Sequence, residues 1–342
     1  MNGLILCRFV RWILFVPGLW ILSSVPVTYL WGKDGVPVLR TVAEILLPGR
    51  TTRFDYASLD TVKRKLYMAH LGDSSIVVFD VVHRRVRTVI PGISSVHGVI
   101  AVSSLEKVFA TATGRDRIVF VDSRQDRIVG EAAAGVHPDG LAYDHRQRLI
   151  FISDETGRSV TVVDPGKEKR LATIPLLGEV GNVRFDPVSG EVYVAVQTRD
   201  EIVSINPVTF RVQRRIRVDA GCHPHGLRID PAGRVAYVAC QFSAKLLLLD
   251  LVTHRILGRF EVGRDPDVLA LDPVRHRLVV ASESGIVSVF VLSRTGWRKA
   301  GDQFVGFKSH TVAIDPETGL FYFPLENEGG SPKLKIMAFY QE

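Results

Sequence analysis

The chain has 342 residues, of which 46% are hydrophobic and 23% are charged. These proportions exclude a largely disordered chain, and the length predicts either two domains or one repeat architecture. The net charge of +7 comes from lysines and arginines that are spread singly along the sequence. This charge permits a nucleic-acid or anionic-membrane partner but does not indicate one.

Residues 1–35 form a predicted membrane-targeting segment. Arg8 and Arg11 precede twenty uncharged residues, 12–31, which are enough for a helix that crosses a bilayer. The positive-inside rule then places the N-terminus in the cytoplasm and the remainder outside it. The alternative is a cleaved signal peptide with its apolar region at residues 12–22. Both interpretations predict a periplasmic or other extracytoplasmic protein, either anchored in the membrane or secreted.

A unit of about 42 residues repeats seven times after this segment. Its most regular part is a run of β-branched and aromatic residues, as in Val192-Tyr193-Val194-Ala195, which is typical of a strand. Another strand precedes each run and mostly ends in Asp before a tight turn, and two strands follow it. The seven runs lie at residues 66–69, 108–111, 150–153, 192–195, 236–239, 278–281 and 320–323.

Four short strands in each of seven units predict an all-β, seven-bladed β-propeller over residues 36–342. A sandwich would not repeat at a fixed period, and a solenoid of this period usually contains helices. The last unit shows only three strands, so we expect the N-terminal strand at residues 38–49 to complete it. The expected blades cover residues 52–93, 94–135, 136–178, 179–221, 222–263, 264–306, and 307–340 with 38–49.

Several motifs resemble the YVTN-repeat family of β-propellers. They are the Tyr-Val-Ala type of second strand, the Arg53-Phe54-Asp55-Tyr56 opening, and the Asp-Pro-x-x-Gly turns at residues 186–190 and 315–319. The resemblance covers roughly residues 38–340. It implies an exported bacterial propeller, with ligand binding or single-stranded DNA binding in some members.

The resemblance also implies a disulfide between Cys222 and Cys240, because members of the family tend to carry such a pair. Cys222 precedes the first strand of its blade and Cys240 ends the second, so a hairpin brings both to the same end. An extracytoplasmic location would permit the bond. Two buried thiols are the alternative.

Equivalent positions of the repeats predict a binding site at one mouth of the central channel. The innermost strand of each blade lines this channel, so side chains at the strand starts point towards one axis. The first such position is His or Asp in six of seven units: Asp55, His97, Asp139, Gly181, His225, Asp267 and His310. The position two residues earlier is almost entirely polar: Arg53, Ser95, His137, Glu179, His223, Asp265 and Lys308.

Histidines carry most of this prediction, because five of the ten in the chain fall in the two rings. Imidazole and carboxylate groups around one point suit a divalent transition metal, with His97, His225 and His310 as candidate ligands, or an acid–base pair. The alternative is a water-filled polar channel in which Asp139 and Asp267 are turn residues. The loops after the second strands are expected on the same face and could also contact a ligand, through His70, Asp154, Gln197, Gln241, Glu283 and Glu326. For each of these residues, a place on a solvated rim is the favoured alternative.

The fold, the predicted export and the lack of a nucleophile or phosphate-loop motif favour a binding module. We expect a monomer that holds a small molecule or an envelope protein at the channel mouth. A metal-assisted hydrolase of the lactonase type, or a lyase, using the same ring is the second hypothesis. Single-stranded DNA binding ranks last, because the aromatic residues occur mainly at predicted core positions and not beside a basic groove.

Overall fold

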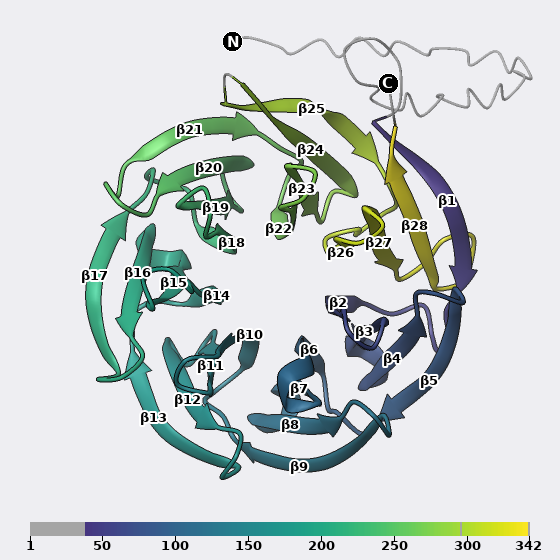
Figure 1. Cartoon of the computed structure of the whole chain (residues 1–342), viewed down its shortest axis with the longest axis horizontal. Coiled ribbons are helices and arrows are strands. Elements are labelled where there is room, and N and C mark those ends of the chain that lie inside the picture. The colour runs from purple at the N-terminus through teal and green to yellow at the C-terminus, as the bar shows by residue number, and fades with distance from the viewer. Residues whose placement is uncertain (1–37, 295, 341–342) are drawn as a thin grey trace, which may run out of the picture.

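The computed structural model describes residues 38–294 and 296–340, which form seven four-stranded antiparallel sheets around a central channel (Figure 1). The predicted all-β, seven-bladed propeller is confirmed. The targeting segment predicted at residues 1–35 lies outside the described residues. Helices of the described part are single short turns, and none could span a membrane. They are η1 (Leu71–Asp73), η2 (Ser103–Leu105), η3 (Thr113–Arg115) and η4 (Gln197–Arg199).

Blades one to six each contain four consecutive strands, with the first strand innermost. Blade one consists of β2 (Phe54–Asp60), β3 (Lys65–His70), β4 (Ser75–Asp80) and β5 (Arg85–Pro91). Blade two consists of β6 (Val96–Val102), β7 (Lys107–Ala112), β8 (Arg117–Asp122) and β9 (Arg127–Ala133). Blade three consists of β10 (Pro138–Asp144), β11 (Leu149–Asp154), β12 (Ser159–Asp164) and β13 (Lys169–Pro175). Blade four consists of β14 (Val180–Phe185), β15 (Val192–Val196), β16 (Glu201–Asn206) and β17 (Arg211–Arg217). Blade five consists of β18 (Pro224–Asp230), β19 (Val235–Cys240), β20 (Lys245–Asp250) and β21 (Ile256–Glu261). Blade six consists of β22 (Pro266–Asp272), β23 (Arg277–Ser282), β24 (Ile286–Ser293) and β25 (Gly296–Phe304).

Blade seven contains strands from both ends of the described chain. From the channel outwards it consists of β26 (Ala313–Asp315), β27 (Leu320–Leu325), β28 (Lys333–Phe339) and β1 (Leu39–Leu46). β1 runs antiparallel to β28, with Leu39 opposite Phe339 and Leu46 opposite Lys333. The outer edge of β28 is therefore paired and does not present free backbone groups to solvent.

The second strand of each blade is buried on both faces because it lies between two neighbouring sheets. β11 and β15 are buried along their whole length, which explains why these strands read as continuous apolar runs in the sequence. The outermost strands behave differently, since β17 leaves most of its side chains at least partly exposed. Apolar burial between the blades is the main force that holds the ring together.

The Asp that ends most inner strands has a structural role. The carboxylate of Asp60 accepts hydrogen bonds from the backbone N–H groups of Val62, at 3.0 Å, and Lys63, at 2.8 Å. Asp186 makes the same contacts with the two N–H groups of its own turn. These aspartates close the turn between the first and second strands, as short polar side chains commonly do.

Close packing of the inner strands requires glycine directly after the His or Asp position in two blades. A Cβ atom on Gly98 would lie 2.0 Å from the backbone oxygen of Asp139, and one on Gly226 would lie 1.8 Å from that of Asp267. Each of these oxygens belongs to the inner strand of the next blade. The missing side chains therefore let neighbouring inner strands approach, which brings the polar groups at their starts within reach of one another.

We expect Gly226→Ala to lower the free energy of unfolding by about 1–3 kcal/mol, because the added methyl group must push β18 away from β22. Urea unfolding measures this change. Gly258→Ala in β21 is the matched control, since its Cβ would meet other atoms only at 3.5 Å or beyond. There we expect a change of at most ~1 kcal/mol, in the stabilising direction. Equal destabilisation by both substitutions would contradict the packing argument.

Candidate functional site: the channel mouth

The starts of the inner strands gather their polar side chains at one end of the channel. We call this end the channel mouth and define it by Arg53, Asp55, His97, Asp139, His225, Asp267, Glu283 and His310. Five of these residues lie on inner strands: Asp55 on β2, His97 on β6, Asp139 on β10, His225 on β18 and Asp267 on β22. Side chains far apart in the sequence thus become neighbours.

Asp55 is the centre of this group. Its Oδ1 atom lies 3.6 Å from Nε2 of His310 and 3.9 Å from Nη2 of Arg53, and its Oδ2 atom lies 3.8 Å from Nε2 of His97. Burial alone would raise the pKa of Asp55, but His310, Arg53 and His97 together lower it to about 2. Asp55 is therefore ionised, and it holds three cationic or ionisable groups around it.

His225 and Asp267 form a second buried pair. The His225 Nε2 atom lies 3.2 Å from Asp267 Oδ1. Burial opposes a charge on the imidazole, but the Asp267 carboxylate outweighs burial and raises the pKa of His225 to about 9. Burial likewise opposes ionisation of Asp267, and the charged imidazole of His225 lowers the pKa of Asp267 below its ordinary value. Both members of the pair are charged near neutral pH.

Arg53 connects these two groups to a loop. Its Nη2 atom lies 3.8 Å from Asp267 Oδ2, and its Nη1 atom donates a 2.5 Å hydrogen bond to Glu283 Oε1. Glu283 Oε2 in turn lies 3.8 Å from His310 Nδ1. Glu283 therefore belongs to the mouth, as the loop prediction proposed for it. The side chains of Arg53 and Glu283 are 35% and 25% exposed, so a molecule in the channel can reach them.

Asp139 differs from the other two aspartates of the ring. It is buried, and burial together with the charge of Asp55 raises the pKa of Asp139 well above its ordinary value. The protonated form of this carboxyl group is therefore favoured more strongly than it would be in water. A neutral carboxyl group beside charged ones can donate a hydrogen bond or a proton to a bound molecule.

His97 and His310 share an orientation that suits metal binding. In each, Nδ1 lies close to a backbone oxygen two residues earlier, that of Ser95 at 2.8 Å and that of Lys308 at 2.9 Å, while Nε2 faces Asp55. Metal-binding imidazoles are commonly held through the second nitrogen in this way.

The ligand atoms of Asp55, Asp267 and His310 lie within 4.8 Å of one another, and among the described residues no other group of three metal-binding side chains does so. The predicted set of His97, His225 and His310 is therefore not gathered at one point. These three histidines come from blades two, five and seven, whereas Asp55 and Asp267 flank His310 from blades one and six.

The second predicted ring forms a rim around the mouth. Five of its members have a left-handed backbone with φ between 47° and 56°: Ser95, His137, His223, Asp265 and Lys308. This conformation marks a sharp corner before each inner strand, and polar residues tolerate it better than β-branched ones. The polar character of this ring thus has a backbone reason besides any contact with a ligand.

Rim side chains make local contacts. His137 Nε2 lies 3.3 Å from Glu155 Oε2, and the His137 ring meets that of His97 edge-on at 5.3 Å. Glu179 lies 3.9 Å from Arg158. His137 therefore extends the mouth outwards, whereas Glu179 faces the rim of blades three and four.

Two exposed aromatic residues on this face were missed by the sequence analysis. Phe242 is 72% exposed and stacks on His223 with ring centroids 3.9 Å apart, and Phe307 is 75% exposed. Phe242 follows the end of β19, and Phe307 lies three residues before His310. Their only sequence signal is their position between strands, where the repeat places no core residue.

Cys222 and Cys240 form a disulfide within blade five, with Cα atoms 4.4 Å apart. Both cysteines are buried. The bond joins the entrance of β18 to the end of β19. Because His223 and His225 directly follow Cys222 along the chain, the disulfide also fixes the backbone that carries them.

Asp154, one of the loop candidates, has a structural role inside blade three. Its Oδ2 accepts hydrogen bonds from Ser159 Oγ at 2.9 Å and Thr161 Oγ1 at 2.8 Å, and its Oδ1 accepts one from the N–H of Gly135 at 2.9 Å. Burial outweighs these hydrogen bonds and raises the pKa of Asp154 to about 6. The carboxyl group of Asp154 makes its hydrogen bonds within the blade and at its edge, and it does not face the channel mouth.

The raised pKa of Asp154 predicts a pH-dependent stability. As pH rises from about 4 to above 6, the unfolded chain releases this proton before the folded chain does. The free energy of unfolding should therefore fall over this range by up to ~3 kcal/mol relative to Asp154→Asn, which has no proton to lose. Urea unfolding of both proteins at pH 4, 5, 6 and 7 measures the difference. A difference that stays constant with pH would contradict the prediction.

No protein-family model and no curated protein matches the sequence. Solved structures resemble its fold. Virginiamycin B lyase from Staphylococcus aureus superposes with a TM-score of 0.72 at 12% identity, over 87% of this chain and 99% of that one. Hydrazine synthase from Kuenenia stuttgartiensis has a TM-score of 0.74 at 12% identity, over 88% of this chain and 99% of that one. The RRP9 WD40 repeats also have a TM-score of 0.74 at 12% identity, over 88% of this chain and 100% of that one. At such identities the similarity shows the propeller fold alone.

Proposed function

We propose that this chain is an exported or membrane-anchored propeller that binds a small polar ligand at the channel mouth. The observation that carries the proposal is the buried network of opposite charges around Asp55. Buried ion pairs contribute little net stability, because desolvation offsets their attraction. Buried titratable groups with shifted pKa values at one end of a channel are instead typical of binding and active sites.

The channel mouth presents both positively and negatively charged side chains to a bound ligand. Arg53, Glu283 and His97 are partly exposed above the buried carboxylates of Asp55 and Asp267. A molecule that carries both donors and acceptors, such as an amino acid or a sugar, can replace the Arg53–Glu283 contact with contacts of its own. Phe242 and Phe307 add apolar surface at the rim for the less polar part of a ligand or for an envelope protein.

Export belongs to this proposal and has two supports. One is the basic and apolar pattern of residues 1–35, together with the resemblance to exported YVTN-repeat propellers. The other is the disulfide between Cys222 and Cys240, because such bonds persist mainly in oxidising compartments outside the cytoplasm.

Thermal-shift measurements on the full-length protein at pH 7, with a panel of amino acids and sugars, test the proposal. We expect at least one compound to raise Tm, and Asp267→Asn and His225→Gln each to weaken its binding at least tenfold in calorimetry, because each leaves a buried charge unpaired. Asp219→Asn is the matched control, since Asp219 pairs with Arg259 on the outer surface. A panel without a binder, or equal binding by all variants, would argue against a site at the mouth.

Metal-assisted elimination or hydrolysis is a second candidate function, favoured by the group formed by Asp55, Asp267 and His310. Two carboxylates and an imidazole suit Mn²⁺ or Zn²⁺, and the raised pKa of Asp139 suits this residue to donate a proton to a leaving group. Virginiamycin B lyase and streptogramin B lyase are lyases by name and share the fold. Arg53 opposes an ion, because its Nη2 lies within 4 Å of both carboxylates.

Equilibrium dialysis of the full-length protein against Zn²⁺ or Mn²⁺ separates the two candidates. The metal-assisted function predicts one ion per chain, lost in His310→Ala and bound at least as tightly in Arg53→Ala, where the competing cation is gone. Asp219→Asn again serves as the control and should bind like the wild type. Absence of a stoichiometric ion from the wild type and from Arg53→Ala would exclude this second function.

A further inference from the structure

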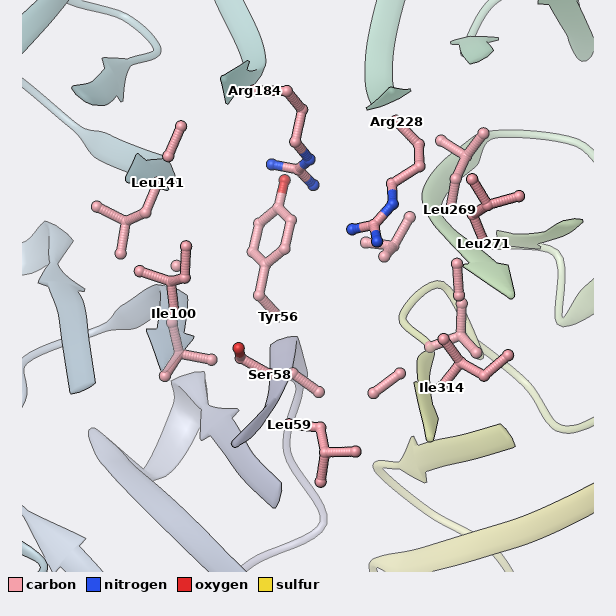
Figure 2. Close-up of a pocket in the computed structure, with 18 of the residues that line it drawn as sticks. Tyr56, Ser58, Leu59, Ile100, Leu141, Arg184, Arg228, Leu269, Leu271 and Ile314 are labelled. Carbon is pink, nitrogen blue, oxygen red and sulfur yellow. The ribbon is translucent and has the colours of Figure 1, made fainter. Parts of the chain in front are cut away.

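The far end of the central channel contains a cavity, and none of the residues that define the channel mouth line it. The cavity has a volume of about 450 Å³ and is lined by the last residues of the inner strands and the turns after them (Figure 2). Tyr56 stands between the two ends. It lines the cavity, and burial followed by the charges of Asp139, Asp267 and Asp55 raises the pKa of Tyr56 well above its ordinary value.

Two arginines reach this cavity from neighbouring blades. Arg184 on β14 and Arg228 on β18 occupy equivalent positions, three residues after the first polar ring. Figure 2 shows both guanidinium groups pointing into the channel. The hydroxyl group of Tyr56 lies next to the guanidinium group of Arg184. The five other blades carry small or aliphatic residues at this position, and all line the cavity: Ser58, Ile100, Ala142, Ala270 and Ala313.

Neither arginine has a carboxylate partner in the part of the chain that the structure describes. Arg184 donates hydrogen bonds to the backbone oxygen of Val183 and to Oδ1 of Asn182, both at 2.8 Å. Arg228 makes no hydrogen bond or ion pair with any described residue, and its Nε atom is buried without an acceptor, as is that of Arg184. Burial, followed by the like charge of Arg184, lowers the pKa of Arg228 to about 10.

Two positive charges therefore share the cavity without an ion-pair partner among the described residues. The described residues that line it include no Asp or Glu. Desolvating a charged group without a partner is unfavourable, and a bound anion would remove this penalty. A guanidinium group also presents a planar fork of donors that matches the oxygens of a carboxylate or phosphate.

Much of the remaining lining is aliphatic, as Figure 2 shows for Leu59, Ile100, Leu141, Leu269, Leu271 and Ile314. The volume falls within the range typical of small-molecule sites, about 300–1,000 Å³. We propose that this far-end cavity binds an amphipathic organic anion, whose carboxylate or phosphate group is held by Arg184 and Arg228 and whose apolar body packs against these aliphatic side chains. This site is independent of the channel mouth, because the two ends use different residues.

Isothermal titration of the full-length protein with four probes tests the composition of the site. Phenylacetate and phenyl phosphate each combine an anionic head with an apolar body, whereas inorganic phosphate and benzyl alcohol each supply only one of these parts. We expect phenylacetate, phenyl phosphate or both to bind at one molecule per chain, at least tenfold more tightly than either of the other two. Their relative affinities distinguish a carboxylate from a phosphate site. Equal affinity for inorganic phosphate or benzyl alcohol would overturn the proposal.

Substitutions at the arginines locate the binding. Arg228→Met and Arg184→Met should each weaken binding at least tenfold. Arg228→Met should also keep or raise the Tm of the protein without probe, because it removes a partly buried charge that has no ion-pair partner among the described residues. This measurement separates lost binding from misfolding. Arg228→Lys keeps the charge but not the fork, so an intermediate affinity is expected.

Two controls complete the test. Arg259→Met changes a surface arginine that pairs with Asp219 on the outside of blade five, and Asp267→Asn changes a mouth residue that does not line the cavity. Both should bind the probes like the wild type, so failure of the mouth proposal and failure of this one are distinguishable. Unchanged affinity in Arg228→Met, or an equal loss in Arg259→Met, would refute the far-end site.

Discussion

The short distance between neighbouring inner strands is the constraint on which both ends of the channel depend. Gly98 and Gly226 leave no room for a side chain between one blade and the next. Without this approach the carboxylates and imidazoles around Asp55 would be separated by water, and their pKa values would stay near the ordinary ones. A Cβ atom on Gly181 would lie 2.7 Å from the backbone oxygen of His225, so blades four and five also approach closely. At the other end of the channel, the like charge of Arg184 contributes to the lowered pKa of Arg228.

The two ends of the channel differ in whether their charged side chains form ion pairs. At the mouth, Arg53, His225 and His310 balance Asp55, Asp267 and Glu283, so the protein supplies both signs itself. At the far end, Arg184 and Arg228 are balanced by no described side chain. A ligand at the mouth must therefore compete with existing ion pairs, whereas one at the far end supplies a charge that the fold lacks.

The repeat made the fold predictable, because a fixed period assigns each strand its place in a blade and each inner-strand residue its ring. It assigned Asp55, His97 and His310 to one ring, and the structure places Nε2 of both histidines within 4 Å of the Asp55 carboxylate, but the repeat did not predict this pairing. Whether His310 or His225 meets a given carboxylate depends on the order of blades around the axis and on side-chain rotamers. Arg184 and Arg228 were visible in the same repeat three positions later. They were not singled out in the sequence analysis, because the two rings compared there lie at other positions of the repeat.

The pairing of β1 with β28 also sets an order of events in folding. Leu39 is among the first described residues to be synthesised, yet its partner Phe339 is among the last. Blade seven can form its full sheet only after β28 has been synthesised, and bringing such distant segments together is entropically slow. Until then β1 has no partner strand, so the nascent molecule is open to intermolecular strand pairing during that interval.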